Sequence, residues 1–242
     1  MMTLHRINRS AKNGFSLVEL AVVLIVVSLL LVGLLGPLTA QQEQKNIMDA
    51  RRQMDEAREA IFGFLVSNGR LPCPANPTLA SANVAAGIER AGGCAGANSI
   101  GVLPWRTLGL READPWGNRF TYRVTDVFAD PTKIAAKSIG FGTNGDLTLW
   151  ATATPPTPIS QANEVVAILV SHGHHADGAW TISGAQLPAS ADADEAQNSD
   201  GDQTFVDHRN TAELPNSAYD DLTVWVPRNL VFNRLMTAGR LP

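Results

Sequence analysis

Cysteine is scarce in this sequence, and an excess of positive charge is absent. The 242 residues include two cysteines, Cys73 and Cys94, which do not form the CxxC pattern of redox dithiols and zinc sites. The formal net charge at pH 7 is −4, so the chain is not expected to bind nucleic acid in general. No Gly-x-Ser-x-Gly motif surrounds Ser171, next to His172, which argues against a hydrolase nucleophile there.

Charge is missing altogether from residues 20–42. Residues 15–35 form an apolar run about as long as the ~20 residues that cross a bilayer as a helix. Glu19 is the exception, and an unpaired charge in hydrocarbon costs ~2.5–3.5 kcal/mol on insertion scales. A plain single-pass anchor would account for the run, as would a secretory signal with a poor cleavage site at Leu38-Thr39-Ala40. Neither explains Glu19.

The order Gly14-Phe15-Ser16-Leu17-Val18-Glu19, after a short basic leader, resembles the processing site of type IV pilins and type II secretion pseudopilins. The resemblance implies that a prepilin peptidase cuts between Gly14 and Phe15 and methylates the new amino terminus. It also implies that Glu19 faces the amino terminus of a neighbouring pilin or pseudopilin subunit in a filament. Such an ammonium group would be the partner that the carboxylate needs inside an apolar bundle.

The charges around the apolar run predict the orientation of the chain. The leader carries Arg6, Arg9 and Lys12, so the positive-inside rule places the amino end in the cytoplasm and the rest of the chain outside it. The resemblance implies that the membrane is the bacterial inner membrane, with the head in the periplasm and later in a periplasmic or surface filament. Removing these three charges takes the formal charge from −4 to about −7. We expect a cleaved leader (1–14), a transmembrane and assembly half-helix (15–38), an amphipathic half-helix (39–68) and an extracytoplasmic α+β head (69–242).

The second half of the expected helix carries one apolar stripe. Gly36 and Pro37 should kink the helix rather than end it. Beyond them, apolar residues recur at steps of three and four, which predicts a face that packs on a head: Ile47, Ala50, Met54, Ala57, Ile61 and Phe64. A short coiled-coil seam is the alternative. Asn68-Gly69 is a good helix end. The fold class is therefore α+β, with a long N-terminal helix on an antiparallel sheet, as in pilin-like proteins.

Residues 71–98 are rich in Pro, Ala, Gly and Asn and predict a long surface loop. In an oxidising compartment, Cys73 and Cys94 could close it, worth about 3 kcal/mol by loop entropy. Beyond the loop, Asp114-Pro115-Trp116-Gly117 predicts a turn. This turn resembles the Asp-Pro-Trp-Gly motif of major pseudopilins, although Arg119-Phe120 replaces the Pro-Tyr usual there.

The head should contain several short strands and one final helix. Strands are predicted at 120–124, 138–142, 147–151, 165–170, 179–182 and 222–226. Asn144-Gly145-Asp146 looks like a hairpin turn between the second and third of these, and the apolar run 165–170 should be a central strand. After Pro227, an amphipathic helix should pack back on the head and end at Gly239, through Leu230, Val231, Leu235 and Met236.

Two groups of residues have side chains suited to metal binding or catalysis, and the first is His172-Gly173-His174-His175 with Asp177. Imidazoles this dense can bind zinc or copper, although a polar loop at the end of a strand is the commoner explanation. His208 is the only other histidine beyond the leader. A three-histidine site would therefore need the fold to bring it close.

The second group is an acidic loop with oxygen ligands at alternating positions and Gly201 for a tight turn. Calcium favours such ligands, although the spacing is not that of an EF-hand and a solvated acidic loop is the alternative. Major pseudopilins, which the chain resembles, hold calcium in a loop near their carboxyl end. The predicted calcium ligands are Asp192, Asp194, Asn198, Asp200 and Asp202.

We therefore expect a pilin-like subunit, processed by prepilin peptidase, whose work is assembly rather than catalysis. The residues do not choose between a pseudopilus and a type IV pilus. Two alternatives stay open: a membrane-tethered binding protein or adhesin that never polymerises, and an anchored hydrolase that uses the histidine group.

Overall fold

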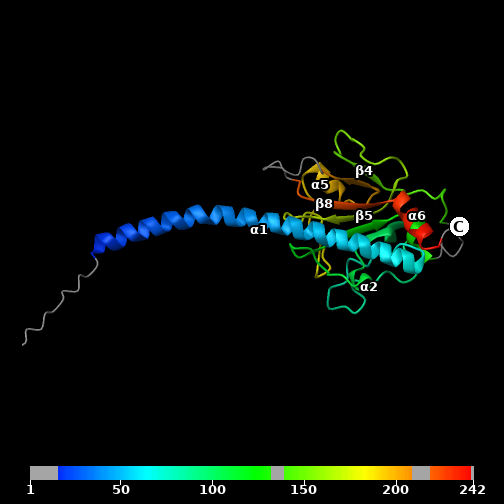
Figure 1. Ribbon diagram of the computed structural model, residues 1–242, viewed down its shortest axis with the longest axis horizontal. Coiled ribbons are helices and arrows are strands. Elements are labelled where there is room, and N and C mark those ends of the chain that lie inside the picture. Colours follow the sequence, from blue (N-terminus) through cyan, green and yellow to red (C-terminus); the bar gives the residue numbers. More distant parts are fainter. Residues whose placement is uncertain (1–15, 132–138, 209–218, 241–242) are drawn as a thin grey trace, which may run out of the picture. The chain divides into compact units, whose positions relative to one another are not determined.

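The computed structural model describes residues 16–131, 139–208 and 219–240, without the side chains of 31–39. Contacts divide the chain into two units, Met1–Lys45 and Asn46–Pro242. We call the second the globular unit. The division falls within helix α1 (Leu17–Asn68), so the residues of α1 from Asn46 onward share a unit with the expected head (Figure 1).

Helix α1 begins at Leu17 and ends at Asn68, the end that the sequence predicts. Ser16 caps its start, because the backbone N–H of Glu19 donates to Ser16 Oγ at 3.1 Å. The helix continues through Gly36 and Pro37. At its end, Gly69 has a φ of +71° and donates its N–H to the carbonyl of Leu65 at 2.8 Å, a left-handed cap that a β-carbon would strain.

A four-stranded antiparallel sheet lies at the centre of the globular unit, in the order β1-β3-β5-β8. Its strands are β1 (Ile100–Val102), β3 (Thr121–Val124), β5 (Val165–Ser171) and β8 (Leu222–Pro227). Two smaller sheets pair β2 (Asn118–Arg119) with β6 (Trp180–Thr181), and β4 (Thr148–Trp150) with β7 (Thr204–Val206). The α+β class and the antiparallel main sheet are thus confirmed.

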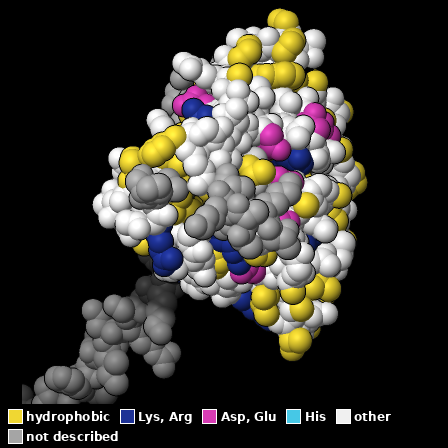
Figure 2. Space-filling view, turned by 90° about the vertical axis from the view of Figure 1, so that its right-hand side faces the viewer, with side chains coloured by type: hydrophobic (Ala, Val, Ile, Leu, Met, Phe, Trp, Pro, Cys, Tyr) yellow, Lys and Arg dark blue, Asp and Glu magenta, His cyan; other side chains and the backbone are white. Residues whose placement is uncertain are grey.

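Short helices connect the strands, and a longer one closes the chain. They are η1 (Gly96–Ser99), α2 (Trp105–Leu108), α3 (Asp126–Ala129), α5 (Ala193–Gln197) and α6 (Arg228–Thr237). On the face shown in Figure 2, Lys and Arg side chains are interspersed with Asp and Glu. The described part of that face therefore shows no large patch of one charge sign.

Strand β5 is central because apolar clusters cover it on both sides. All seven of its residues are buried, as the unbroken apolar run predicts. Val166 and Leu169 belong to the largest cluster of buried apolar residues, called the main cluster below, to which α1 and α6 also contribute. Val165 and Ile168 belong to a second apolar cluster with residues of β4 and β7. Because both faces are covered, β5 fixes the position of the turn that follows it.

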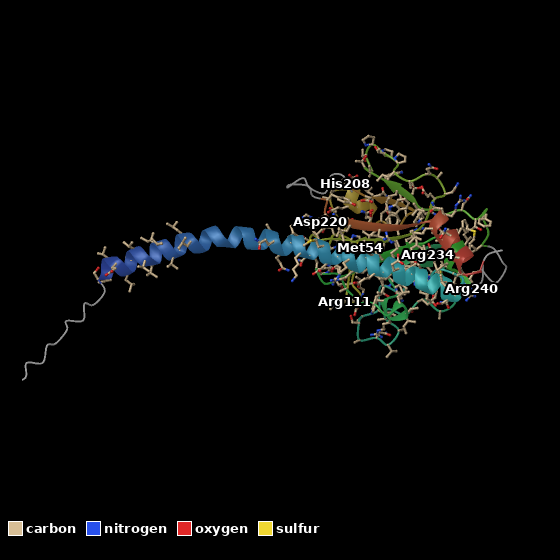
Figure 3. The ribbon with its side chains drawn as sticks, viewed as in Figure 1. Met54, Arg111, His208, Asp220, Arg234 and Arg240 are labelled. Atoms are coloured by element: carbon tan, nitrogen blue, oxygen red, sulfur yellow. A yellow bond between two sulfur atoms is a disulfide. The ribbon has the colours of Figure 1, made fainter. Side chains whose placement is uncertain are left out.

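The apolar stripe of α1 supplies one wall of the main cluster. Ala50, Met54, Ala57 and Ile61 are all buried, which confirms this part of the predicted face. Figure 3 shows Met54 on the part of α1 that runs along the sheet. The helix also buries Phe62 and Leu65, which the stripe did not include.

The strand predicted at 138–142 is wrong. Ser138 lies outside the described residues, and residues 140–143 form a turn closed by the Thr143 N–H, which donates to the Gly140 carbonyl at 2.8 Å. The predicted hairpin fails with it, because β4 pairs in parallel with β7. Gly145 is needed for a different reason. A β-carbon there would lie 2.1 Å from the carbonyl oxygen of Val165, so the glycine lets the chain pass close to β5.

The final helix is confirmed, with one correction. Val231 and Leu235 are buried and Leu230 packs at the edge of the main cluster, but Met236 is 45% exposed. Phe232 occupies the buried position instead, since it lies on the face of α6 shared by Val231 and Leu235. Gly239 has a φ of +65° just beyond the helix end.

Candidate functional site

The predicted processing site lies at the start of α1. Gly14 and Phe15 lie outside the described residues. Glu19 is in the first turn of the helix and is exposed, as are all its neighbours from Ser16 to Leu30. An acidic side chain in a first turn also interacts favourably with the helix dipole.

The side chains of α1 up to Leu30 are apolar on every side of the helix, apart from Glu19 and Ser28. Ser28 Oγ bonds back to the Leu24 carbonyl within the helix, which satisfies its hydroxyl. A helix with apolar side chains all round is normally covered by lipid or by other apolar surfaces. Among the described residues, we find no helix whose length and apolarity together suffice to cross a membrane.

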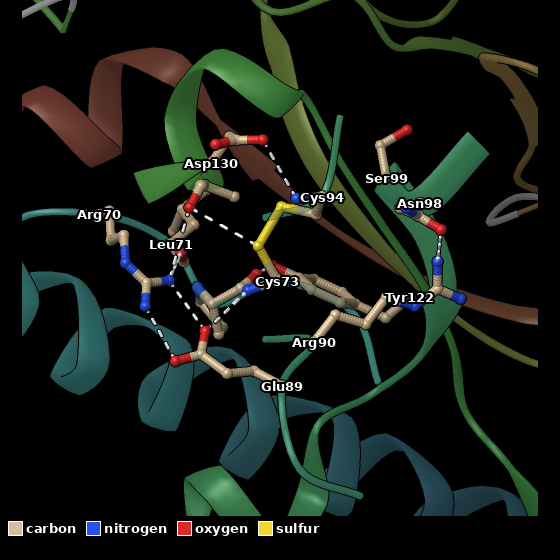
Figure 4. The surroundings of a disulfide bond; sticks show 12 residues. Arg70, Leu71, Cys73, Glu89, Arg90, Cys94, Asn98, Ser99, Tyr122 and Asp130 are labelled. Atoms are coloured by element: carbon tan, nitrogen blue, oxygen red, sulfur yellow. Dashed lines mark hydrogen bonds and ion pairs between the residues drawn. A yellow bond between two sulfur atoms is a disulfide. The ribbon is translucent and has the colours of Figure 1, made fainter. Parts of the chain in front are cut away.

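The two cysteines form a disulfide, as predicted, with Cα atoms 5.6 Å apart (Figure 4). Both sulfur-bearing residues belong to the main apolar cluster. The Cys94 N–H donates to Asp130 Oδ2 at 3.1 Å, and Glu89 accepts two bonds of 2.8 Å from the guanidinium of Arg70. The bridge and these bonds attach the long loop to the core, and that loop is irregular over most of 71–98, as expected.

The Asp-Pro-Trp-Gly turn forms as predicted. Asp114 Oδ1 accepts the N–H groups of Trp116 and Asn118, both at 3.0 Å, and Gly117 has a φ of +89°. Asp114 Oδ2 accepts the hydroxyl of Ser171 at 2.6 Å. The turn is therefore bonded to the end of β5, which brings residues around 114 close to those around 172.

The acidic loop uses its oxygen atoms mainly within the protein. Asp192 caps α5 by accepting the N–H groups of Asp194 and Glu195, and Asp194 accepts the Ala153 N–H at 2.6 Å. The Asn198 side chain is buried, and Asp202 Oδ1 accepts the Thr204 N–H at 2.6 Å. Asp200 accepts the side-chain amide of Gln197 at 2.8 Å. Calcium binding by these five residues stays a prediction.

The histidine group is divided between the interior and the surface. His172 is buried, with its Nε2 2.9 Å from Thr121 Oγ1 and its Nδ1 3.5 Å from Asp221 Oδ1. Burial lowers the pKa of His172, but attraction to Asp221, with Asp114 and Glu195, outweighs burial and leaves its pKa raised. His172 is therefore a core histidine held by an acid. His174 and His175 are exposed, and Asp177 is half-buried.

The described residues contain two groups of three side chains whose possible ligand atoms lie within 4.8 Å of one another. One joins His174 and His175 to Asp220, and the other joins Glu195, Asp220 and Asp221. No member of the predicted calcium set is in either group, and His208 lies instead 2.7 Å from Asp194. The sequence reasoning missed Asp220, which stands next to the start of β8 (Figure 3).

The pairing of two predicted strands could have indicated that Asp220 lies near the histidine group. Strands β5 and β8 are antiparallel, and Ser171 is paired with Leu222. Residues just after β5 therefore lie beside residues just before β8. Predicting that pairing would have brought the acids at 220 and 221 to the histidines at 172–175.

Comparison with known proteins bears on the amino-terminal segment. No match was found among curated proteins or among solved structures. Residues 9–35 match the family model described as the prokaryotic N-terminal methylation motif, so they include Gly14, Phe15 and Glu19. The chain thus carries the prepilin-type signal of type IV pilins and pseudopilins.

Proposed function

We propose that this chain is a pilin-like structural subunit, a pseudopilin or a minor type IV pilin. Prepilin peptidase cuts it between Gly14 and Phe15 and methylates Phe15, and the mature chain assembles with other pilin subunits. The observation that carries this proposal is the match of residues 9–35 to the methylation motif. The apolar start of α1, with Glu19 in its first turn, supports it.

The proposed cellular course follows from the same segment. The apolar helix anchors the precursor in the bacterial inner membrane with the globular unit in the periplasm, and assembly then places the chain in a periplasmic or surface filament. A disulfide between Cys73 and Cys94 agrees with an oxidising compartment. The work of the protein is assembly for secretion, adhesion or DNA uptake rather than catalysis.

Glu19 has a specific part in this proposal. In a filament, its carboxylate pairs with the methylated ammonium group of a neighbouring Phe15, and each charge makes burial of the other less costly. Without Glu19, the helix still enters the membrane, but the incoming ammonium group has no partner.

The first experiment is the intact mass and amino-terminal sequence of the membrane-extracted chain, from cells with and without prepilin peptidase. A chain that begins at methylated Phe15 only when the peptidase is present supports the proposal. A chain that begins at Gln41 would indicate a cleaved secretory signal. A start at Met1 or Met2 in both strains would indicate a plain anchor and overturn the processing proposal.

A second experiment tests assembly through Glu19→Ala, with Glu56→Ala as the matched control on the same helix. Glu56 is exposed and pairs with Arg52 at 3.6 Å. We expect Glu19→Ala to reach the membrane and to be processed but to be excluded from sheared filament fractions, and Glu56→Ala to assemble normally. Normal assembly of Glu19→Ala would overturn the proposed role of Glu19. Absence of the unmodified chain from the filament fractions would favour the tethered binding protein that does not polymerise.

A further inference from the structure

The turn after β5 and the residue pair before β8 meet at one end of the main sheet. The Ala176 N–H donates to the His172 carbonyl at 2.9 Å, which closes a turn that contains His174 and His175. The backbone N–H of His175 donates to Asp220 Oδ2 at 2.8 Å. A hydrogen bond from a backbone N–H to a carboxylate therefore joins the two segments, and this bond does not require a ligand.

Three potential metal ligands converge there. His174, His175 and Asp220 each offer one ligand atom, and the three atoms lie within 4.8 Å of one another. His175 Nδ1 is 3.4 Å from Asp220 Oδ2. The imidazole of His175 is 47% exposed and the Asp220 side chain 24%, so an ion can reach the group from solvent.

A separate observation points to a ligand. Asp220 Oδ1 is buried, yet no described residue donates a hydrogen bond to it. A buried acceptor without a donor is destabilising, more so if it is charged, so this oxygen needs a partner. Its place is also built around the carboxylate: a β-carbon at Gly173 would lie 2.5 Å from Asp220 Cγ, so only glycine admits the acid there.

Charge at the same point favours a cation. Glu195 and Asp221 are each 2% exposed and offer oxygen atoms within 4.8 Å of that of Asp220. Three acids this close repel one another when ionised, and a bound divalent ion would relieve that repulsion.

We propose that His174, His175 and Asp220 bind one divalent transition-metal ion, with Zn²⁺ the best fit. Two imidazoles and a carboxylate are a zinc ligand set, whereas calcium takes oxygen ligands. Three ligands from this chain leave a fourth position for water. Glu195 accepts the Asp220 N–H at 2.9 Å, so it is a positioning residue for Asp220 rather than a ligand.

The metal would fasten the end of the central strand β5 to the beginning of the edge strand β8. This proposal does not depend on processing at Gly14, and either could fail without the other. It also differs from the predicted calcium loop, which shares no residue with it.

The test is a Zn²⁺ titration of the purified full-length chain in detergent, carrying no polyhistidine tag and stripped with EDTA. We expect one Zn²⁺ per chain by calorimetry and by elemental analysis after gel filtration, together with a rise in the melting temperature. His174→Gln, His175→Gln and Asp220→Asn should each weaken binding more than the about 10- to 100-fold that loss of a second-shell partner costs.

His208→Gln is the matched control, because His208 also contacts an aspartate, at 2.7 Å from Asp194, but lies outside the three-ligand group. It should bind Zn²⁺ like the unmodified chain. His174 is exposed, so His174→Gln should fold normally, which circular dichroism can verify, and it keeps the test valid if Asp220→Asn unfolds. Absence of stoichiometric Zn²⁺ would overturn the proposal. So would equal losses in His208→Gln, or Ca²⁺ binding that needs Asp220 but not His174.

Discussion

Asp114 is a buried acid in the turn that leads into β2. Burial raises its pKa, and the hydrogen bonds from Ser171, Asn118 and Trp116 compensate only in part. Because the pKa of Asp114 is higher in the folded chain than in the unfolded chain, protonation of its carboxyl group stabilises the fold. That stabilisation is complete below about pH 4 and is lost as the pH rises through the folded pKa.

The prediction concerns Asp114→Asn, which keeps the shape of the side chain but cannot ionise. An amide oxygen can still accept the N–H groups of Trp116 and Asn118. The variant should therefore gain stability relative to the unmodified chain as the pH rises from about 4 to about 7. Urea unfolding midpoints at both pH values measure this. A difference that does not change with pH would contradict it.

At this scale, the sequence reveals residues that act locally. The Asp-Pro-Trp-Gly turn was predicted because its bonds join residues at most four apart. The convergence of His175 with Asp220 joins residues 45 apart, and no local pattern contains it. His172 was placed with the candidate ligands because its neighbours are histidines, whereas its burial depends on strand pairing with β3.

Among the helices and strands, α1 and β5 both contribute buried residues to the main cluster. Met54 is 0% exposed in the main cluster, whereas Met48, earlier on the same helix, is 62% exposed. Removing a buried methionine side chain loses its transfer free energy and leaves a cavity. Removing an exposed one does neither.

We expect Met54→Ala to lower the free energy of unfolding of the globular unit by about 2–5 kcal/mol, and Met48→Ala to change it by less than about 0.5 kcal/mol. Chemical denaturation of the two variants, followed by circular dichroism, compares them directly. Similar effects would mean that the apolar stripe does not pack on the sheet.

Elements whose apolar residues recur at a regular spacing were predicted correctly. Elements whose pairing depends on contacts between residues far apart in the sequence were not. The stripe of α1 and the apolar run of β5 show their burial in the residue order itself. The parallel pairing of Leu149 with Phe205 depends on how the chain returns across the core, which neither segment shows. The hairpin turn predicted at 144–146 is wrong because Gly145 serves a close approach to β5, a contact that the local sequence does not show.

For the whole molecule, the division between Lys45 and Asn46 predicts which part of the chain can fold independently. The apolar clusters of the globular unit draw all their residues from Met54 onward. No residue before Asn46 whose side chain the structure describes belongs to these clusters. The globular unit should therefore be able to fold alone.

We predict that a chain comprising residues 46–242 unfolds in one cooperative transition, with a melting temperature within about 3 °C of that of the same unit in the full-length protein. Differential scanning calorimetry of both, under oxidising conditions, provides the measurement. A broad, non-cooperative transition in the shorter chain would show that the first 45 residues contribute to its stability.

The position of β8 in the chain has a consequence for biosynthesis. This strand covers one edge of β5, the most apolar strand, and helix α6 comes after it in the chain. A nascent or truncated chain that stops before Leu222 would expose the backbone groups of β5 along that edge, together with the side of the core that α6 covers. Such an edge can pair with other chains, so the chain is not protected from aggregation at this edge until β8 has been made.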